Sequence, residues 1–309
     1  MDKMNTRIRN YRSEDREALV RFWTEVVKME ETHERPLIRE LTDNLDRPNH
    51  FPGKNLFIAE NMGNIIGHID VFPETDIGRV VVQCLVHPEY RRKGIAEKLV
   101  ERAIERAIEL KVKIAHANIS QDDKAGKRLF SKMGFRFVRR YLELGLDLSK
   151  VRLSKIKRND YPCRPMNQGE EEKLTRLQNR SFMDTWGFNP NTMEDIIYRI
   201  HLSVASFKDI ILCLDGAKPI GYCWSKIYED DDKVLYGTRA RINMLGVDPD
   251  YRGKGVGKKV LLNGLIQLKG RGVRHVILTV DNENKVARSL YQSVGFKPRT
   301  SSLWYQKDL

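Results

Sequence analysis

The feature of this sequence that most constrains its fold is an internal repeat. The segment Val86–Ala96 (VHPEYRRKGIA) returns as Val247–Gly257 (VDPDYRGKGVG), at an offset of 252 − 91 = 161 positions between the matching arginines. The same offset joins Gly134-Phe135 to Gly295-Phe296, so the stretch contains no insertion. A repeat of this length indicates two copies of one domain. We expect them at residues 1–149 and 160–309, joined by a linker rich in Lys and Arg over residues 149–161.

Length and composition agree with two globular domains. The chain has 309 residues, 40% of them hydrophobic, enough to fill two modest cores. We find no apolar run long enough for a membrane span and no signal peptide at the N-terminus. The four cysteines form no CxxC pair, which argues against a disulfide framework or a zinc site. We therefore expect a cytoplasmic protein with no membrane partner and no bound metal.

The net charge of the chain indicates which classes of ligand it can be expected to bind. The chain has 55 Lys and Arg against 42 Asp and Glu, a formal net charge of +13. The charges are mixed in sign, and neither half has the long basic run of a nucleic-acid tail. A positive excess favours polyanions in general, phosphorylated cofactors among them. Nucleic acid ranks last among the expected partners, because only the net charge supports it. The sequence does not predict an oligomeric state.

Apolar periodicity predicts the same order of elements in both copies. Strands are expected at residues 7–11, 55–60, 65–71, 79–86, 113–119 and 137–147, and again at 163–166, 209–214, 219–228, 240–247, 275–280 and 302–307. Helices are expected after Ser13, at 95–108 and at 124–133, and then at 170–182, 192–201, 256–268 and 285–293. The helix at 95–108 is expected to place Ile95, Leu99, Ala103, Ile104, Ala107 and Ile108 on one buried face. Both copies thus have the pattern of an α/β domain.

The repeated motif has the form of an anion-binding turn. Arg252–Gly257 follows an apolar strand and precedes an amphipathic helix, where unpaired backbone N–H groups and the positive end of the helix dipole suit a pyrophosphate. Gly255 and Gly257 lack the Cβ atoms that would keep an anion from the backbone. A Walker A loop needs Ser or Thr after its lysine, but Lys258 is followed by Lys259. A GxGxxG motif needs a glycine three positions after Gly255, where this chain has Lys258. The alternative is a structural glycine turn that binds nothing.

With a second motif, the chain resembles the GNAT family of acetyl-CoA-dependent N-acetyltransferases. The pattern N-x-x-A-x-x-L-Y-x-x-x-G-F, which follows R-x-x-G-x-G/A in that family, occurs at Asn284–Phe296. Two copies cover nearly the whole chain, as in family members built from two such domains, and three short segments strengthen that likeness: Asn179–Phe182, Gly221–Lys226 and Gly246–Pro249. The resemblance implies a fold class of α/β (α+β), two tandem domains, each a mixed, mostly antiparallel, splayed sheet flanked by helices.

The resemblance also implies a site in the second copy. The pantetheine arm of acetyl-CoA would pair with the backbones of Leu245 and Val247, with Asn284 near the cofactor. The pyrophosphate would be held by Arg252, Gly253, Lys254, Gly255, Val256 and Gly257. An amine would attack the thioester directly, and Tyr291 would protonate the leaving thiolate as general acid. The alternative for Tyr291 is a helix tyrosine that only packs against the sheet.

The first copy departs from this pattern. Phe130 stands at the position of Tyr291 and Asp123 at that of Asn284, and phenylalanine cannot donate a proton. Its loop keeps the cofactor-binding pattern at Val86, Arg91, Arg92, Lys93, Gly94, Ile95 and Ala96. We expect the first copy to be non-catalytic, either a second cofactor site or a purely structural domain.

The general base and the acceptor are less determined. Tandem family members have a glutamate near the start of the central strand, where this chain has Arg241. A water, a carboxylate of Glu229–Asp232 or an amine that arrives neutral could serve instead. Trp186–Phe188 could line the acceptor pocket or pack on the surface. Isolated His201 and His275, and Cys213 and Cys223 in strand patterns, are expected to be structural.

The expected activity is acetylation of a primary amine, on a small molecule. One alternative is a peptide N-terminus, because the Tyr291 motif is also similar to that of ribosomal-protein acetyltransferases. The other is a non-catalytic acetyl-CoA-binding regulator.

Overall fold

The chain forms two compact units. The computed structural model describes residues 6–29, 38–151, 153, 161–202, 206–228 and 238–309. Unit 1 consists of Met1–Arg139 and Ser302–Leu309, and unit 2 of Arg140–Ser301. Among the described residues, no helix combines the length and apolarity needed to cross a bilayer.

Unit 1 is a mixed sheet with helices on both faces. Its strands, in spatial order, are β1 (Thr6–Asn10), β2 (Leu56–Asn61), β3 (Asn64–Glu74), β4 (Arg79–Val86), β5 (Ile114–Ser120) and the end of β12 (Lys297–Asp308). Its helices are α1 (Arg16–Met29), α2 (Ile38–Leu45), α3 (Pro52–Asn55), α4 (Ile95–Glu109) and α5 (Lys124–Lys132). Neighbouring strands are antiparallel except β4 and β5, which are parallel. The short helices α2 and α3 were not expected from the sequence.

Unit 2 repeats this arrangement. Its strands, in spatial order, are β6 (Arg136–Asp147), β11 (His275–Asp281), β10 (Arg239–Val247), β9 (Lys218–Tyr228), β8 (Ile210–Asp215) and β7 (Cys163–Pro165). Its helices are α6 (Glu171–Phe182), α7 (Met193–Ile200), α9 (Val256–Gly270) and α10 (Lys285–Val294). Here β10 and β11 form the parallel pair. The expected fold class, a mixed and mostly antiparallel sheet flanked by helices, is confirmed in both units.

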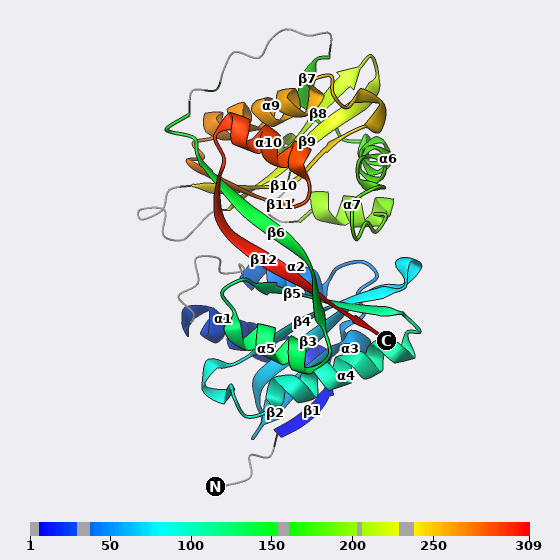
Figure 1. Ribbon diagram of the computed structural model, residues 1–309, viewed down its shortest axis with the longest axis vertical. Helices are drawn as coiled ribbons and strands as arrows, with labels where there is room; N and C mark the ends of the chain where they lie inside the picture. Colours follow the sequence, from blue (N-terminus) through cyan, green and yellow to red (C-terminus); the bar gives the residue numbers. More distant parts are fainter. Residues whose placement is uncertain (1–5, 30–37, 152, 154–160, 203–205, 229–237) are drawn as a thin grey trace. The chain divides into compact units, whose positions relative to one another are not determined.

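The last strand of each sequence copy completes the sheet of the other unit. Tyr141–Asp147 of β6 pairs antiparallel with β11 in unit 2, and Ser302–Asp308 of β12 pairs with β5 in unit 1 (Figure 1). The expected ranges 1–149 and 160–309 follow the repeat, whereas the compact units divide the chain after residues 139 and 301. Most of the linker expected between the copies lies outside the described residues.

Each sheet opens beside its central strand. The parallel pairing joins only Arg239–Ile242 of β10 to His275–Leu278 of β11. Beyond these residues the two strands do not pair with each other. In unit 1 the β4–β5 register is equally short. A β-bulge at Asn243 also interrupts the β10–β9 register, whereas β4 keeps an unbroken register with β3. The bulge therefore distinguishes unit 2 from unit 1.

Two hydrophobic cores cover the two faces of the unit 2 sheet. One packs α9 and α10 against β10 and β11, and the other packs α6 and α7 against β8 and β9 (Figure 1). Unit 1 has the same division, with α4 and α5 on one face and α1 on the other. The prediction for the buried face of α4 was wrong at Ile108, which is 59% exposed, whereas Val100 is buried. The face is centred on Leu99, Ala103 and Ala107, and residue 108 lies a further 100° around the helix.

Deleting β12 tests the strand exchange. A fragment of residues 1–149 lacks β12, which leaves β5 as an open edge and removes Leu303 and Tyr305 from the unit 1 core. We expect this fragment to aggregate, or to be less stable to denaturant by at least about 3 kcal/mol than the same fragment with residues 297–309 attached through a flexible linker. Equal unfolding midpoints for the two fragments would show that unit 1 does not need β12.

Candidate active site

The predicted anion loop of unit 2 presents backbone donors without partners. Arg252 N–H donates to the Pro249 carbonyl and Lys259 N–H to the Gly255 carbonyl, but no backbone acceptor in the described part of the chain binds the N–H groups of residues 253–258. Gly253 and Gly255 have φ of +77° and +79°, and a Cβ at either would meet nothing within 4 Å. These donors at the start of α9 fit the pyrophosphate of a coenzyme.

Side chains of neighbouring elements hold this loop in place. Arg252 Nη2 donates to the Ser181 carbonyl at the end of α6 (2.8 Å), so its guanidinium is engaged within the protein. Arg180 bridges Asp248 (3.1 Å) and Asp250 (3.0 Å) at the turn before the loop. Burial opposes the charge of Asp248, but its hydrogen bonds outweigh this, and its pKa lies below the usual value. Arg252 would thus contribute to ligand binding mainly through its position in the loop.

The open edge of β10 carries the predicted pantetheine contacts. Asp248 N–H donates to the Ile220 carbonyl on the β9 side (2.9 Å). The N–H and C=O of one residue share an edge of a strand, and the edge alternates from residue to residue, so those of Leu245 and Val247 face the opening beside β11. Polar groups at this edge can pair with the amides of an extended ligand. Both residues thus lie at the open edge of β10, and their pairing with the pantetheine arm stays a prediction.

Tyr291 lies in α10 on the same face as α9. It is 7% exposed, belongs to the α9/α10 core and packs edge-on against Phe296, with ring centroids 5.8 Å apart. Burial, and secondarily Cys223, raises the pKa of its phenol. Tyr291 is therefore a neutral O–H donor throughout the physiological pH range. In unit 1, Phe130 packs against Phe135 in the same way (5.1 Å).

Asn284 caps the N-terminus of α10, a structural role that was not predicted from the sequence. Its Oδ1 accepts a hydrogen bond from Ala287 N–H (3.0 Å) and caps α10. Asp123 caps α5 in the same way, through Gly126 N–H (2.7 Å). The Asn-to-Asp difference between the copies therefore preserves a cap, and it says little about cofactor binding.

Unit 1 has the same donor geometry as unit 2. Arg92 and Gly94 adopt φ of +64° and +77°, matching Gly253 and Gly255. No backbone acceptor among the described residues binds the N–H groups of residues 92–97. The bond from His87 N–H to the Ile66 carbonyl turns the peptide group of Val86 toward the opening between β4 and β5. The loop and the strand edge of unit 1 thus have the same backbone geometry as those of unit 2.

Several other groups predicted from the sequence can be placed. Arg241 donates to Glu143 and to Thr279, both at 3.0 Å. Trp186 lies beside Tyr141, with ring centroids 6.3 Å apart. The acidic loop Glu229–Asp232 lies outside the described residues. In the described part of the chain, no group of three His, Cys, Asp or Glu side chains is arranged to bind a metal.

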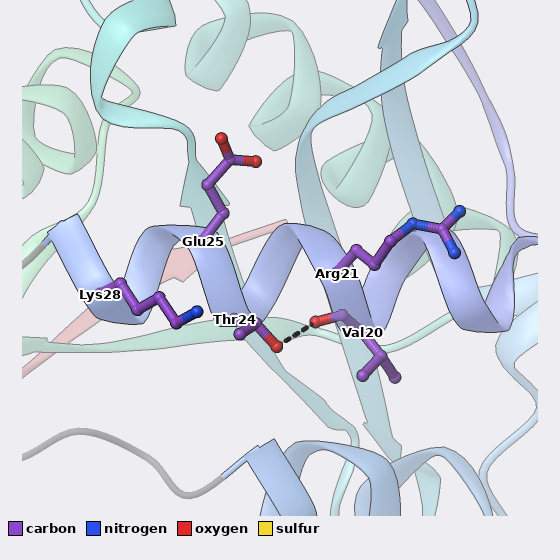
Figure 2. A pocket seen from close by; sticks show the side chains of 5 residues that line it. All are labelled: Val20, Arg21, Thr24, Glu25 and Lys28. Atoms are coloured by element: carbon purple, nitrogen blue, oxygen red, sulfur yellow. Dashed lines mark hydrogen bonds between the residues drawn. The ribbon is translucent and has the colours of Figure 1, made fainter.

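A separate hollow lies on the outer face of α1 in unit 1. It is lined by Val20, Arg21, Thr24, Glu25 and Lys28, and its three charged side chains do not converge (Figure 2). None of the predicted site residues lines it.

The motifs and the geometry agree with a comparison of the chain with protein families. The sequence profile of the acetyltransferase (GNAT) family matches residues 16–135 and 172–296. The chain belongs to this family. It is therefore an acyltransferase, of a family that uses acetyl-CoA, and the resemblance inferred from the motifs is confirmed.

Relatives and solved structures agree with this assignment. A mycothiol acetyltransferase of Amycolatopsis mediterranei is 27% identical over 84% of this chain and 86% of its own length. One from Stackebrandtia nassauensis is 27% identical over 84% of each chain. The fold is similar to a GCN5-related N-acetyltransferase from Sphaerobacter thermophilus (TM-score 0.75, 19% identity, 98% and 95% coverage). It is also similar to a tandem GNAT protein from the clavulanic acid biosynthesis pathway (TM-score 0.76, 15% identity, 98% of each chain).

Substitution of the loop glycines tests whether each of the two loops binds a coenzyme. We expect wild type to bind two acetyl-CoA molecules per chain in calorimetry, and Gly94→Val and Gly255→Val to bind one each, because a side chain at positive φ distorts the loop. Gly169→Val is the matched control, since Gly169 also has positive φ (+87°) and open space but lies outside both loops. We expect all three variants to lose about 1–2 kcal/mol of stability. Undiminished binding by Gly255→Val would contradict the assignment of its loop.

Proposed function

We propose that unit 2 transfers the acetyl group of acetyl-CoA directly to the primary amine of a small molecule. The observation that carries the proposal is the combination, in this unit, of free loop donors, an open and bulged β10, and a buried phenol in α10. The relatives named mycothiol acetyltransferase, matched over 84% of this chain, support a small-molecule acceptor. A peptide N-terminus is the alternative acceptor, and thiol release measured with a panel of small amines and peptides distinguishes the two.

Different residues of unit 2 would hold the coenzyme and stabilise the charge that develops during the reaction. Acetyl-CoA supplies the acetyl group as a thioester, an acyl donor with a good leaving group. The N–H groups of residues 253–258 would hold its pyrophosphate, and the peptide groups of Leu245 and Val247 its pantetheine arm. N–H donors at the open edge of β10 would stabilise the negative charge that develops on the carbonyl oxygen.

Proton transfer completes the chemistry. The neutral amine forms a C–N bond as the C–S bond breaks, and Tyr291 donates its phenolic proton to the departing sulfur. The surplus proton of the new amide nitrogen then leaves through solvent, and one proton returns to the Tyr291 oxygen. We propose that unit 1, which has Phe130 at this position, binds acetyl-CoA without transferring the acetyl group.

Tyr291→Phe tests the general acid. We expect kcat to fall about 10²–10³-fold with little change in the KM for acetyl-CoA, because only the proton donor is lost. Since burial raises the pKa of Tyr291 above its ordinary value of 10, its ionisation should not reduce the wild-type rate between pH 7 and 9.

The matched control for this test is Tyr305→Phe, a similarly buried tyrosine of unit 1, which should keep the wild-type rate. Tyr291→Phe with wild-type turnover across pH 7–9 would refute the general-acid role. Absence of thiol release with every amine and peptide of a broad panel would contradict the proposed transfer and would favour the alternative of a non-catalytic acetyl-CoA-binding regulator.

A further inference from the structure

One pair of buried side chains is hydrogen-bonded in unit 1 but not in unit 2. In unit 1, Trp23 Nε1 donates to His68 Nε2 (2.9 Å), and both side chains are buried. The matching positions of unit 2 hold Gln178 and Tyr222, both 0% exposed. Neither amide atom of Gln178 nor the Tyr222 hydroxyl has a hydrogen-bond partner among the described residues. Unit 2 thus has three buried polar atoms without partners, whereas in the pair of unit 1 this holds only for His68 Nδ1.

The two helix positions match through the turn that precedes each helix. Asp15, directly before α1, accepts a hydrogen bond from the backbone N–H three residues earlier (2.8 Å), and Glu170 does the same directly before α6 (2.9 Å). The offset between these carboxylates is 170 − 15 = 155 positions. The same offset matches Trp23 to Gln178, because both helices run on without interruption.

The two strand positions match through the sheet register. Gly67 pairs with the last residue of β4, as Gly221 pairs with the last residue of β10. The residues that follow them on β3 and β9 are His68 and Tyr222. His68 is bonded to α1, and Tyr222 belongs to the α6/α7 core. Both pairs therefore lie between the first long helix of their unit and the strand next to the central strand.

Tyr222 lies against the part of β10 that has no strand partner toward β11. It is the register partner of Gly246, which lies beyond the parallel pairing. A Cβ on Gly246 would be 2.5 Å from Tyr222 Cε1 and 2.9 Å from Ser181 Cβ of α6. The residues on either side of this glycine, Leu245 and Val247, are the predicted contacts of the pantetheine arm. Only the backbone of β10 therefore separates the tyrosine ring from the edge at which the coenzyme is expected.

Two further differences replace apolar side chains of unit 1 by smaller residues. Gly246 stands at the position of Leu85, which packs against the α1 core. Ser181 stands at the position of Val26, which is buried in that core. The Ser181 hydroxyl donates to the Leu177 carbonyl (2.7 Å), so it does not pair with the free atoms. At matching positions beside the opening, unit 1 is thus filled by apolar side chains, whereas unit 2 is smaller and more polar.

The unpartnered atoms of unit 2 are neutral. The amide of Gln178 carries no charge, and burial raises the pKa of Tyr222 well above its ordinary value, so its phenol stays protonated. The amide offers donors at Nε2 and an acceptor at Oε1, and the phenol can do either. Because buried polar groups are normally hydrogen-bonded, three atoms without partners indicate a ligand group. A hydroxyl is the smallest neutral group that both donates and accepts.

We propose that Gln178 and Tyr222 bind a hydroxyl group of the amine that accepts the acetyl group. This assignment rests on the proposed function of unit 2 and names the class of acceptor, an amino alcohol. The hydroxyl binds on the α6 side of Gly246, and the amine reaches the thioester at the unpaired edge of β10. In unit 1, the bond between Trp23 and His68 closes the matching position, in agreement with a unit that binds acetyl-CoA without transferring the acetyl group.

Matched amines test this assignment. We measure thiol release from acetyl-CoA with amino alcohols of increasing chain length. Each is compared, at equal concentration of neutral amine, with the alkylamine that has a methyl group in place of the hydroxyl and with the amino amide that has a carboxamide there. We expect the amino alcohol to be preferred over both by at least about tenfold in kcat/KM, because a methyl group leaves the buried polar atoms unpaired.

Gln178→Met and Tyr222→Phe remove the polar atoms and keep the approximate size of the side chains. We expect each variant to reduce the preference for the amino alcohol at least about threefold, through the KM for the amine, with the KM for acetyl-CoA unchanged. The unfolding midpoint should not fall, because the atoms removed have no partner in the described part of the protein. A merely structural role would instead lower the midpoint and leave the preference unchanged.

Gln168→Met is the matched control, since Gln168 is exposed ahead of α6, and it should keep the full preference. If Gln178→Met does not fold, Tyr222→Phe alone decides the outcome. No preference, a preference for the methyl or carboxamide analogue, or a preference that is unchanged in either folded variant overturns this proposal alone. Absence of thiol release with every amine overturns the proposed function as well.

Discussion

The candidate site depends on a sheet whose two central strands stay paired over only four residues. In unit 2 the pairing of β10 with β11 ends at Ile242, so the peptide groups of Leu245 and Val247 have no strand on one side. Unpaired backbone groups are costly when they are buried, and they are tolerated where solvent or a ligand satisfies them. The same argument applies to the N–H groups at the start of α9. The fold thus provides a row of polar backbone groups that a polar, extended and anionic ligand can satisfy.

Most of the element order could be predicted from the sequence, because apolar periodicity is a local property. The helix at 95–108 was misjudged only at Ile108, and α3 was missed because four residues show no period. The strand exchange could not be predicted. Residues 137–147 and 302–307 have the same strand pattern whichever sheet they join, so the pattern alone does not identify their partners.

The site was predicted where its chemistry is in the backbone, and missed where it depends on tertiary contacts. Glycines at positive φ reveal the loop, since few other residues accept that conformation. Asn284 was ambiguous, because a cap and a ligand contact require the same side chain. Glu143 could not be found, because it is 98 residues from Arg241 and belongs to the other sequence copy. The bulge at Asn243 was missed because the recognisable repeat begins only after it, at Val247; in the structure the offset between the copies is 239 − 79 = 160 before the bulge and 161 after it.

The two copies serve as an internal comparison that separates coenzyme binding from acetyl transfer. Both keep the loop conformation, even where it is unfavourable: Arg92 has a φ of +64°, a conformation that costs a residue with a side chain about 1–2 kcal/mol. In unit 2, the bulge in the central strand and the phenol of Tyr291 have no counterpart at the matching positions of unit 1, β4 and Phe130. We propose that features shared by both copies hold the coenzyme, and that those confined to unit 2 carry the chemistry at its reactive end. The conformation kept at Arg92 supports the proposal that unit 1 still binds acetyl-CoA, since a glycine would close the same connection at lower cost.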